Sequence, residues 1–199
     1  MNKDFWNKRY SEQEFAYGTE PNAFLKERLE NIKHGTALFL GEGEGRNAVY
    51  AAKLGWQVDA VDFSSFAKDK ALKLAKENKV NINYEVCDLN DYHIKENYYD
   101  IVVMIFLHLP IELRRKVFQK SIHSLKQNGR MIIEAFSKEQ INNSSGGPQS
   151  IDLLYSENDV LNLVKDLNTE LIESKTISLD EGEHHKGKVD VIRYVGVKN

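Results

Sequence analysis

Hydrophobic positions along the chain follow two alternating spacings. Short apolar runs, typical of buried strands, are separated by stretches in which apolar residues recur every three or four positions, as on one face of a helix. The predicted strands are Ala37–Leu40, Gln57–Asp62, Ile82–Cys87, Tyr99–Phe106 and Met131–Phe136. The predicted helices are Asn22–Lys33, one from Arg46 to Gly55, one capped by Ser64 or Ser65, one from Pro110 to Gly129 and one opened by Ser156.

The order of these elements predicts the fold class. Strand and helix alternate five times, and two consecutive strand patterns follow at Leu171–Leu179 and Val189–Val197. Short connections with right-handed crossovers convert such an alternation into a parallel sheet covered on both faces. We therefore expect an α/β fold with a doubly wound, mostly parallel, seven-stranded Rossmann-like sheet. The last two strands are expected to form an antiparallel pair.

Composition and charge exclude several classes of protein. The 199 residues contain 27 Lys and Arg against 30 Asp and Glu, a net charge of −3, so the basic excess of a nucleic-acid binder is absent. Cys87 is the only cysteine, which excludes an internal disulfide and a multi-cysteine zinc site. The longest apolar run, Ile101–Leu107, is too short to span a membrane, and the first residues lack the apolar segment of a signal peptide. We expect a cytoplasmic protein with a small-molecule partner, no nucleic acid and no membrane.

A glycine-rich loop follows the first strand, where ligands of doubly wound sheets bind. Gly41, Gly43 and Gly45 alternate with Glu42 and Glu44, and Asp62 ends the second strand. Glycine lets a ligand lie against the main chain, and a carboxylate at the end of strand two can accept hydrogen bonds from both ribose hydroxyls. A tight turn alone would also use glycine, but the combination favours a nucleoside-containing cofactor. The candidate cofactor residues at this point are Gly41, Glu42, Gly43, Gly45, Arg46 and Asp62.

Two cofactor classes fit this arrangement, a dinucleotide and S-adenosylmethionine. The dinucleotide fingerprint requires a third glycine at the place of Arg46. Glu42 and Glu44 would in addition repel a pyrophosphate. S-adenosylmethionine has no phosphate and carries a sulfonium and an ammonium, so acidic neighbours suit it. The sequence favours S-adenosylmethionine.

Three further residues have a place if the cofactor is S-adenosylmethionine. Asp88, after the third strand, can accept from the adenine amino group, while the backbone N–H of Leu89 faces the ring. An N-cap or a solvated loop is the alternative for Asp88. Phe63, next to Asp62, either stacks on adenine or packs against the protein.

Together these motifs resemble a family. The chain resembles class I S-adenosylmethionine-dependent methyltransferases, and within them the small enzymes of the tellurite-resistance and thiopurine-methyltransferase-like group. The segments that carry the resemblance are Phe5–Tyr10, Tyr17–Asn22, Leu38–Asn47, Val58–Asp62, Cys87–Leu89, Tyr99–Val103 and Leu125–Arg130. Two positions depart from the family pattern. Phe39 stands where an acid usually supports the glycine loop, a role that Glu42 or Glu44 can substitute, and Arg130 replaces a turn glycine.

The resemblance implies one methyltransferase domain over residues 1–199. Residues 1–35 would supply a cofactor lid and a helix, 36–136 the cofactor-binding core, and 137–199 the substrate-side loop, a helix and the last two strands. Trp6, Tyr10, Tyr17 and Gly18 would cover the methionine end of the cofactor, although ordinary packing also explains these aromatic residues. Phe106, ending the fourth strand, would border the cofactor's amino group through its carbonyl.

The acceptor side offers weaker candidates. His108, which follows the fourth strand, is the candidate catalytic residue and acceptor contact, or else a loop histidine bonded to backbone. Glu134, Gln140, His184 and His185 are further acceptor candidates. Adjacent histidines match no zinc spacing, so we expect no metal, and their loop either reaches over the acceptor pocket or is simply solvated.

The predicted function is methyl transfer from S-adenosylmethionine to a small molecule by in-line displacement. Orientation supplies most of the acceleration of such a reaction, and a base is needed only for a protonated acceptor. The alternatives are a nicotinamide-dependent oxidoreductase and a non-enzymatic S-adenosylmethionine-binding module.

Overall fold

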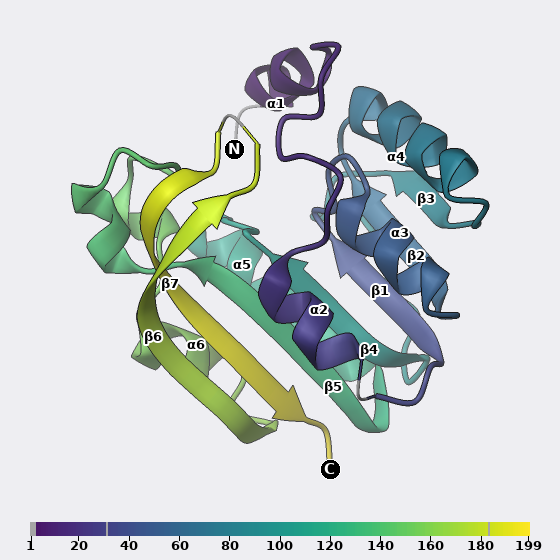
Figure 1. Ribbon diagram of the computed structural model, residues 1–199. Coiled ribbons are helices and arrows are strands. Elements are labelled where there is room, and N and C mark those ends of the chain that lie inside the picture. Colours follow the sequence, from purple (N-terminus) through teal and green to yellow (C-terminus); the bar gives the residue numbers. More distant parts are fainter. Residues whose placement is uncertain (1–2, 31, 183) are drawn as a thin grey trace.

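The computed structural model describes residues 3–30, 32–182 and 184–199. In this part of the chain, the strands form one seven-stranded sheet in the order β3-β2-β1-β4-β5-β7-β6 (Figure 1). All neighbouring strands from β3 to β5 are parallel, and β7 is antiparallel to both β5 and β6. The predicted doubly wound sheet with an antiparallel C-terminal pair is confirmed. The strands are β1 (Thr36–Leu40), β2 (Gln57–Asp62), β3 (Asn83–Val86), β4 (Tyr99–Ile105), β5 (Leu125–Phe136), β6 (Asn168–Asp180) and β7 (Lys186–Val197).

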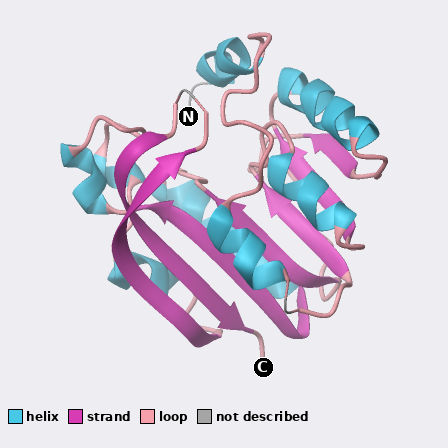
Figure 2. Ribbon diagram, viewed as in Figure 1, coloured by secondary structure: helices cyan, strands magenta, loops and turns pink. Residues whose placement is uncertain are grey.

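The helices form layers on both faces of the sheet (Figures 1 and 2). Helices α2, α3 and α4 cover one face, α5 and α6 cover the other, and α1 lies above the edge at which the parallel strands end. The helices are α1 (Lys3–Tyr10), α2 (Ala23–Leu29), α3 (Arg46–Lys53), α4 (Ser65–Glu77), α5 (Ile111–Ser124) and α6 (Glu157–Leu163), with short 3₁₀ turns η1 (Lys138–Asn142) and η2 (Ile151–Leu153).

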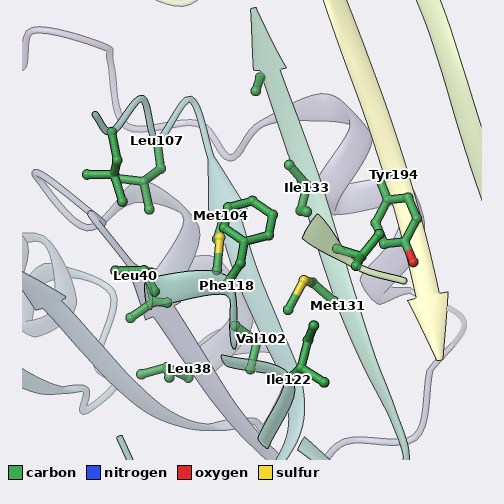
Figure 3. Packing of buried hydrophobic residues seen from close by; sticks show 14 of the residues in the cluster. Leu38, Leu40, Val102, Met104, Leu107, Phe118, Ile122, Met131, Ile133 and Tyr194 are labelled. Atoms are coloured by element: carbon green, nitrogen blue, oxygen red, sulfur yellow. The ribbon is translucent and has the colours of Figure 1, made fainter. Parts of the chain in front are cut away.

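Alternation along the strands divides the core in two. In β1, Leu38 and Leu40 pack toward α5 and α6, whereas Ala37 and Phe39 pack toward α2 and α3. Successive side chains of a strand point to opposite faces, so apolar residues at every position bury both faces of the sheet. Figure 3 shows the α5 side, where Phe118 and Ile122 meet residues of β1, β4 and β5. This core fixes the strand ends, from which the site is built.

Several boundaries differ from the prediction. Helix α5 ends at Ser124 rather than at Gly129, and Leu125 already pairs with Tyr99. The carbonyls of His123 and Ser124 accept the N–H groups of Asn97 and Tyr98, which diverts them from further helical turns. Helix α2 ends at Leu29 instead of Lys33, and Lys3–Tyr10 forms a helix that the apolar spacing did not indicate.

Candidate functional site

The glycine loop, residues 41–45, is held by hydrogen bonds to β2 and β3. The N–H groups of Gly41 and Glu42 donate to the carbonyl of Val61, and the N–H of Gly43 donates to Asp62 Oδ2 at 3.1 Å. Gly43 has a φ of +62°, and a Cβ there would lie 2.8 Å from the hydroxyl of Tyr10. Glycine is required at this position, because both the left-handed backbone and the close approach of Tyr10 exclude a side chain.

Asp62 is buried at the end of β2 and is held by backbone alone. Its Oδ1 accepts the N–H of Ser64 at 3.0 Å, and its Oδ2 accepts the N–H of Gly43. Burial raises the pKa of this carboxyl to about 6, while these N–H groups oppose the shift. A carboxylate has about four acceptor positions, so these contacts leave acceptor capacity for a ligand.

The two glutamates of the loop have different partners. Glu42 Oε1 accepts the N–H groups of Asn47 and Ala48 at 3.1 and 2.7 Å, at the start of α3, and burial raises its pKa to about 8. Glu44 accepts the N–H of Ala16 at 2.8 Å and pairs with Lys70 at 2.7 Å. Glu42 therefore supports the loop from α3, and Glu44 ties it to residues 11–21, which we call the strap.

A cavity of about 720 Å³ opens above the ends of the parallel strands. Its floor comes from the glycine loop, Asp62 and the residues that follow β3 and β4. Its roof comes from α1, Tyr17 and Gly18 of the strap, residues 144–149, and residues 184–186 of the β6–β7 hairpin. Residues 184–186 belong to the tip of this hairpin, which also contains residues 181–182. The N-terminal segments and the β6–β7 hairpin therefore enclose the same cavity.

Most of the predicted site residues line this cavity. They are Trp6, Tyr10, Tyr17, Gly18, Gly41, Glu42, Gly43, Arg46, Asp62, Phe63, Asp88, Leu89, Phe106, His108, His184 and His185. Gly45 does not; it starts α3, and a Cβ there would lie 2.5 Å from the Cβ of Ala71. Its glycine is explained by the packing of α3 against α4.

Two predicted acceptor contacts lie away from the cavity. Glu134 is fully buried and pairs with Arg193 and the amide of Asn22. Gln140 binds the carbonyl of Gly146 and the N–H of Asp190. Because protein groups occupy both side chains, we correct the prediction and leave them out of the acceptor site.

His108 lies in the cavity wall with both ring nitrogens engaged. Its Nδ1 is 2.9 Å from the carbonyl of Leu153, and its Nε2 accepts the N–H of Phe136 at 3.4 Å. Burial lowers the pKa of His108 to about 4, so the ring is neutral. This is the arrangement of a histidine bonded to backbone, the second of the two interpretations that the sequence allowed.

His185 is buried like His108, but one of its ring nitrogens has no hydrogen-bond partner. The ring contacts Tyr17, Phe106 and Phe136, with centroid distances of 4.3, 4.7 and 5.3 Å. Its Nδ1 makes no hydrogen bond and lies 3.6 Å from Glu181 Oε2. Burial lowers the pKa of His185, and Glu181 opposes that shift, so the ring is neutral at neutral pH with a carboxylate beside it.

Arg46 joins the two parts of the roof. One guanidinium nitrogen lies 3.3 Å from the carbonyl of Tyr17 in the strap, and another donates to Glu181 at 2.8 Å in the hairpin tip. Gly182 touches the strap directly, since a Cβ there would lie 2.7 Å from the carbonyl of Ala16. Sequence spacing could not reveal this contact, because its partners are far apart along the chain.

Two further observations concern the described residues. None of their helices is long and apolar enough to cross a membrane. Nor does this part of the chain gather three His, Cys, Asp or Glu side chains in a position to hold a metal ion.

Comparison with known proteins gives the class. Residues 37–129 match the family model described as "Methyltransferase domain". The fold matches the crystal structure of TehB from Haemophilus influenzae with a TM-score of 0.75 at 20% identity, over 99% of this chain and 67% of that one. It also matches phosphoethanolamine N-methyltransferase 2 of Haemonchus contortus in complex with S-adenosyl-L-methionine, with a TM-score of 0.69 at 20% identity, over 98% of this chain and 56% of that one. Residues 37–129 therefore match a methyltransferase domain, and the chain has the fold of class I methyltransferases, as the sequence predicted.

Within that class, the sequence is similar to TehB itself. It is 24% identical over 166 residues to the "Probable S-adenosyl-L-methionine-dependent methyltransferase TehB" of H. influenzae, covering 82% of this chain and 54% of that protein. A shorter match, 29% over 92 residues, is to "Hemagglutinin 1" of Eikenella corrodens and covers 45% of this chain and 31% of that protein. The chain thus spans about half or less of these curated relatives. The predicted relation to the tellurite-resistance group and the predicted cofactor, S-adenosylmethionine, agree with these matches.

Proposed function

We propose that the protein transfers a methyl group from S-adenosylmethionine to a small-molecule acceptor. The observation that carries this proposal is that the two ends of the cavity are lined by different kinds of residue. One end has the glycine loop and a buried carboxylate at the end of β2, and the other has His185 among aromatic rings.

The residues at the floor fit S-adenosylmethionine. Asp62 retains acceptor capacity for ribose hydroxyls, and Gly41 and Gly43 both line the cavity. The carboxylates of Glu44 and Asp62 beside this loop suit a cationic ligand and oppose a pyrophosphate. Phe63, Asp88 and Leu89 would hold the adenine, and Phe106 and the strap the methionine end. When bound, S-adenosylmethionine supplies an activated methyl group on a sulfonium.

The other end of the cavity would hold the acceptor. Phe106, Phe136 and Tyr17 form an aromatic wall around His185, which excludes water and orients an acceptor beside the floor. Neutral His185 would accept the proton of a thiol or hydroxyl acceptor, and Glu181 would stabilise the resulting imidazolium. His108 would shape the wall rather than transfer a proton, because backbone groups occupy both its nitrogens.

Binding of S-adenosylhomocysteine, measured by calorimetric titration with NAD as the control ligand, tests the cofactor assignment. We expect micromolar binding of S-adenosylhomocysteine and none of NAD. Asp62→Asn should weaken S-adenosylhomocysteine binding by about 1.5–3 kcal/mol, the contribution of a hydrogen bond to a charged group. Binding of NAD alone would support an oxidoreductase instead, and unchanged affinity in Asp62→Asn would remove Asp62 from the site.

Binding without turnover would favour a non-enzymatic module. The enzymatic half of the proposal is tested by incubating the protein with labelled S-adenosylmethionine and a panel of thiols, phenols and amines. We expect His185→Gln to keep S-adenosylhomocysteine binding within about twofold while transfer to an acceptor that must lose a proton falls about 10²-fold or more. A His108→Gln variant that lost transfer while His185→Gln kept it would reverse the two roles.

A further inference from the structure

Tyr84 reaches the glycine loop from the sheet edge. It lies on β3, is 5% exposed, and packs in the core with Phe39 and Ala71. Its hydroxyl donates to the carbonyl of Gly43 at 2.6 Å. Burial, together with the nearby Asp62 carboxylate, raises the pKa of Tyr84 well above its ordinary value, so the hydroxyl keeps its proton and remains a donor.

Gly43 is therefore fixed on both sides. The peptide before it is held through its N–H by Asp62, and the peptide after it is held through its carbonyl by Tyr84. Two rotatable bonds at a glycine would otherwise leave these peptides free to turn, since glycine adopts positive and negative φ with equal ease. The next residue, Glu44, carries the hydrogen bond to the strap at Ala16.

The support at Tyr84 matters here because the end of β1 gives none. Phe39 is fully buried and apolar, and it stands two residues before Gly41, where its side chain offers the loop no hydrogen bond. The polar contacts of Gly43 come instead from β2 and β3. The position of this peptide also decides where Asp62 points, because one Asp62 oxygen is bound to it.

We propose that Tyr84 is a positioning residue for the cofactor: its hydroxyl fixes the Gly43 carbonyl and so holds the glycine loop and Asp62 in the conformation that binds S-adenosylmethionine. This inference rests on the proposed function. Tyr84 does not line the cavity, so its effect on binding is transmitted through Gly43 and not through contact with the ligand.

The test compares two Tyr→Phe variants in calorimetric titrations with S-adenosylhomocysteine. Tyr84→Phe leaves a buried carbonyl without its donor, and we expect the Kd to rise about 5- to 20-fold. Tyr99→Phe is the matched control, because its hydroxyl also makes a hydrogen bond, at 2.7 Å to Asp59, but neither residue lines the cavity or touches the loop. We expect its Kd to stay within about twofold of wild type. Thermal unfolding without ligand establishes that both variants are folded.

A double-mutant cycle separates positioning from general destabilisation. Asp62→Asn and Tyr84→Phe act on the same residue, so we expect the combined loss of affinity to differ from the product of the single losses by about threefold or more. Asp62→Asn with Tyr99→Phe should give the simple product. Wild-type binding with an unchanged Kd in Tyr84→Phe, or an equal loss in Tyr99→Phe, would overturn the role of Tyr84 alone. Absence of binding in the wild type would overturn the proposed function with it.

Discussion

Carboxyl groups of individual residues determine how the glycine loop is held. Glu42 and Asp62 each accept hydrogen bonds from backbone N–H groups, and both also line the cavity. The sequence placed both residues at the ends of the first two strands and allowed Glu42 or Glu44 to support the loop. It could not specify the partners, since the amides of Asn47, Ala48 and Ala16 become available only through the positions of α3 and the strap.

The raised pKa of Glu42 predicts a pH dependence of stability. The folded protein keeps this carboxyl protonated up to about pH 8, whereas its ordinary pKa is 4.5. The folded state therefore binds more protons, and the free energy of unfolding falls as the pH rises through the window below the raised value. We expect the melting temperature of the ligand-free protein to drop by several degrees between about pH 6.5 and 8.5.

Glu42→Gln provides the control for this prediction, because its side chain keeps the acceptor oxygen and cannot ionise. Its melting temperature should be nearly constant over the same range, measured by differential scanning calorimetry. Asp62, with a pKa of about 6, is largely ionised in both states over this range. His108 and His185, whose pKa values are lowered by burial, act only near the lower end of the range and in the opposite sense, because only the unfolded state protonates them there. An equal slope in Glu42→Gln would assign the dependence to another group.

Among the secondary-structure elements, the β6–β7 hairpin has the largest consequence for the site. It continues the sheet at its antiparallel edge and carries His185 at its tip to the far side of the cavity. Glu181 pairs with Arg46, Gly182 packs on the strap and the His185 ring contacts Tyr17, and these contacts hold the tip in place. The hairpin was predicted from its two strand patterns, but its direction over the cavity follows from the curvature of the long strands, which no local pattern encodes.

Two glycines of this hairpin allow a matched test of that contact. Gly182 and Gly187 both have positive φ, of +80° and +106°. A Cβ at 182 would meet backbone of the strap at 2.7 Å, whereas at 187 the nearest atom is 3.6 Å away. We expect Gly182→Ala to lower cofactor affinity about tenfold and Gly187→Ala to leave it nearly unchanged, while both lose about 1 kcal/mol of stability from backbone strain.

Titration calorimetry and thermal unfolding of both variants check this expectation. Equal affinities in the two variants would show that the tip of the hairpin closes the cavity without bearing on the strap. A loss in Gly187→Ala alone would instead place the sensitive contact at Ser145, the neighbour of that glycine.

For the molecule as a whole, the sequence correctly predicted a mostly parallel seven-stranded sheet with an antiparallel C-terminal pair, because buried strands and amphipathic helices have distinct periodicities. It missed α1, whose short sequence Lys3–Tyr10 has no clear apolar face, and extended α5 to Gly129. It also left the interpretation of His108 and His185 open. That distinction depends on carbonyls and rings contributed by β5, η2 and the hairpin, which are brought together only by the complete fold.

Because the strap and the hairpin tip contribute to the same roof, we expect ligand binding to affect both segments. With S-adenosylhomocysteine bound, amide hydrogen exchange should slow about tenfold or more in residues 14–18 and in residues 181–182 and 184–186 together, because both segments enclose the same cavity. Residues 170–175 of β6, at the opposite edge, serve as the internal control and should exchange as before. Protection of the strap without the hairpin tip would contradict a common roof.

The contact between the strap and the hairpin tip also has a consequence for folding during synthesis. The contact between Gly182 and Ala16 joins residues that lie far apart along the chain, so Ala16 leaves the ribosome long before Gly182. The parallel part of the sheet is complete once Phe136 has emerged, so the floor of the cavity can form on a growing chain. The roof has to wait for the hairpin, and until then Arg46 lacks its carboxylate partner Glu181. Assembly of the acceptor end therefore follows formation of the cavity floor.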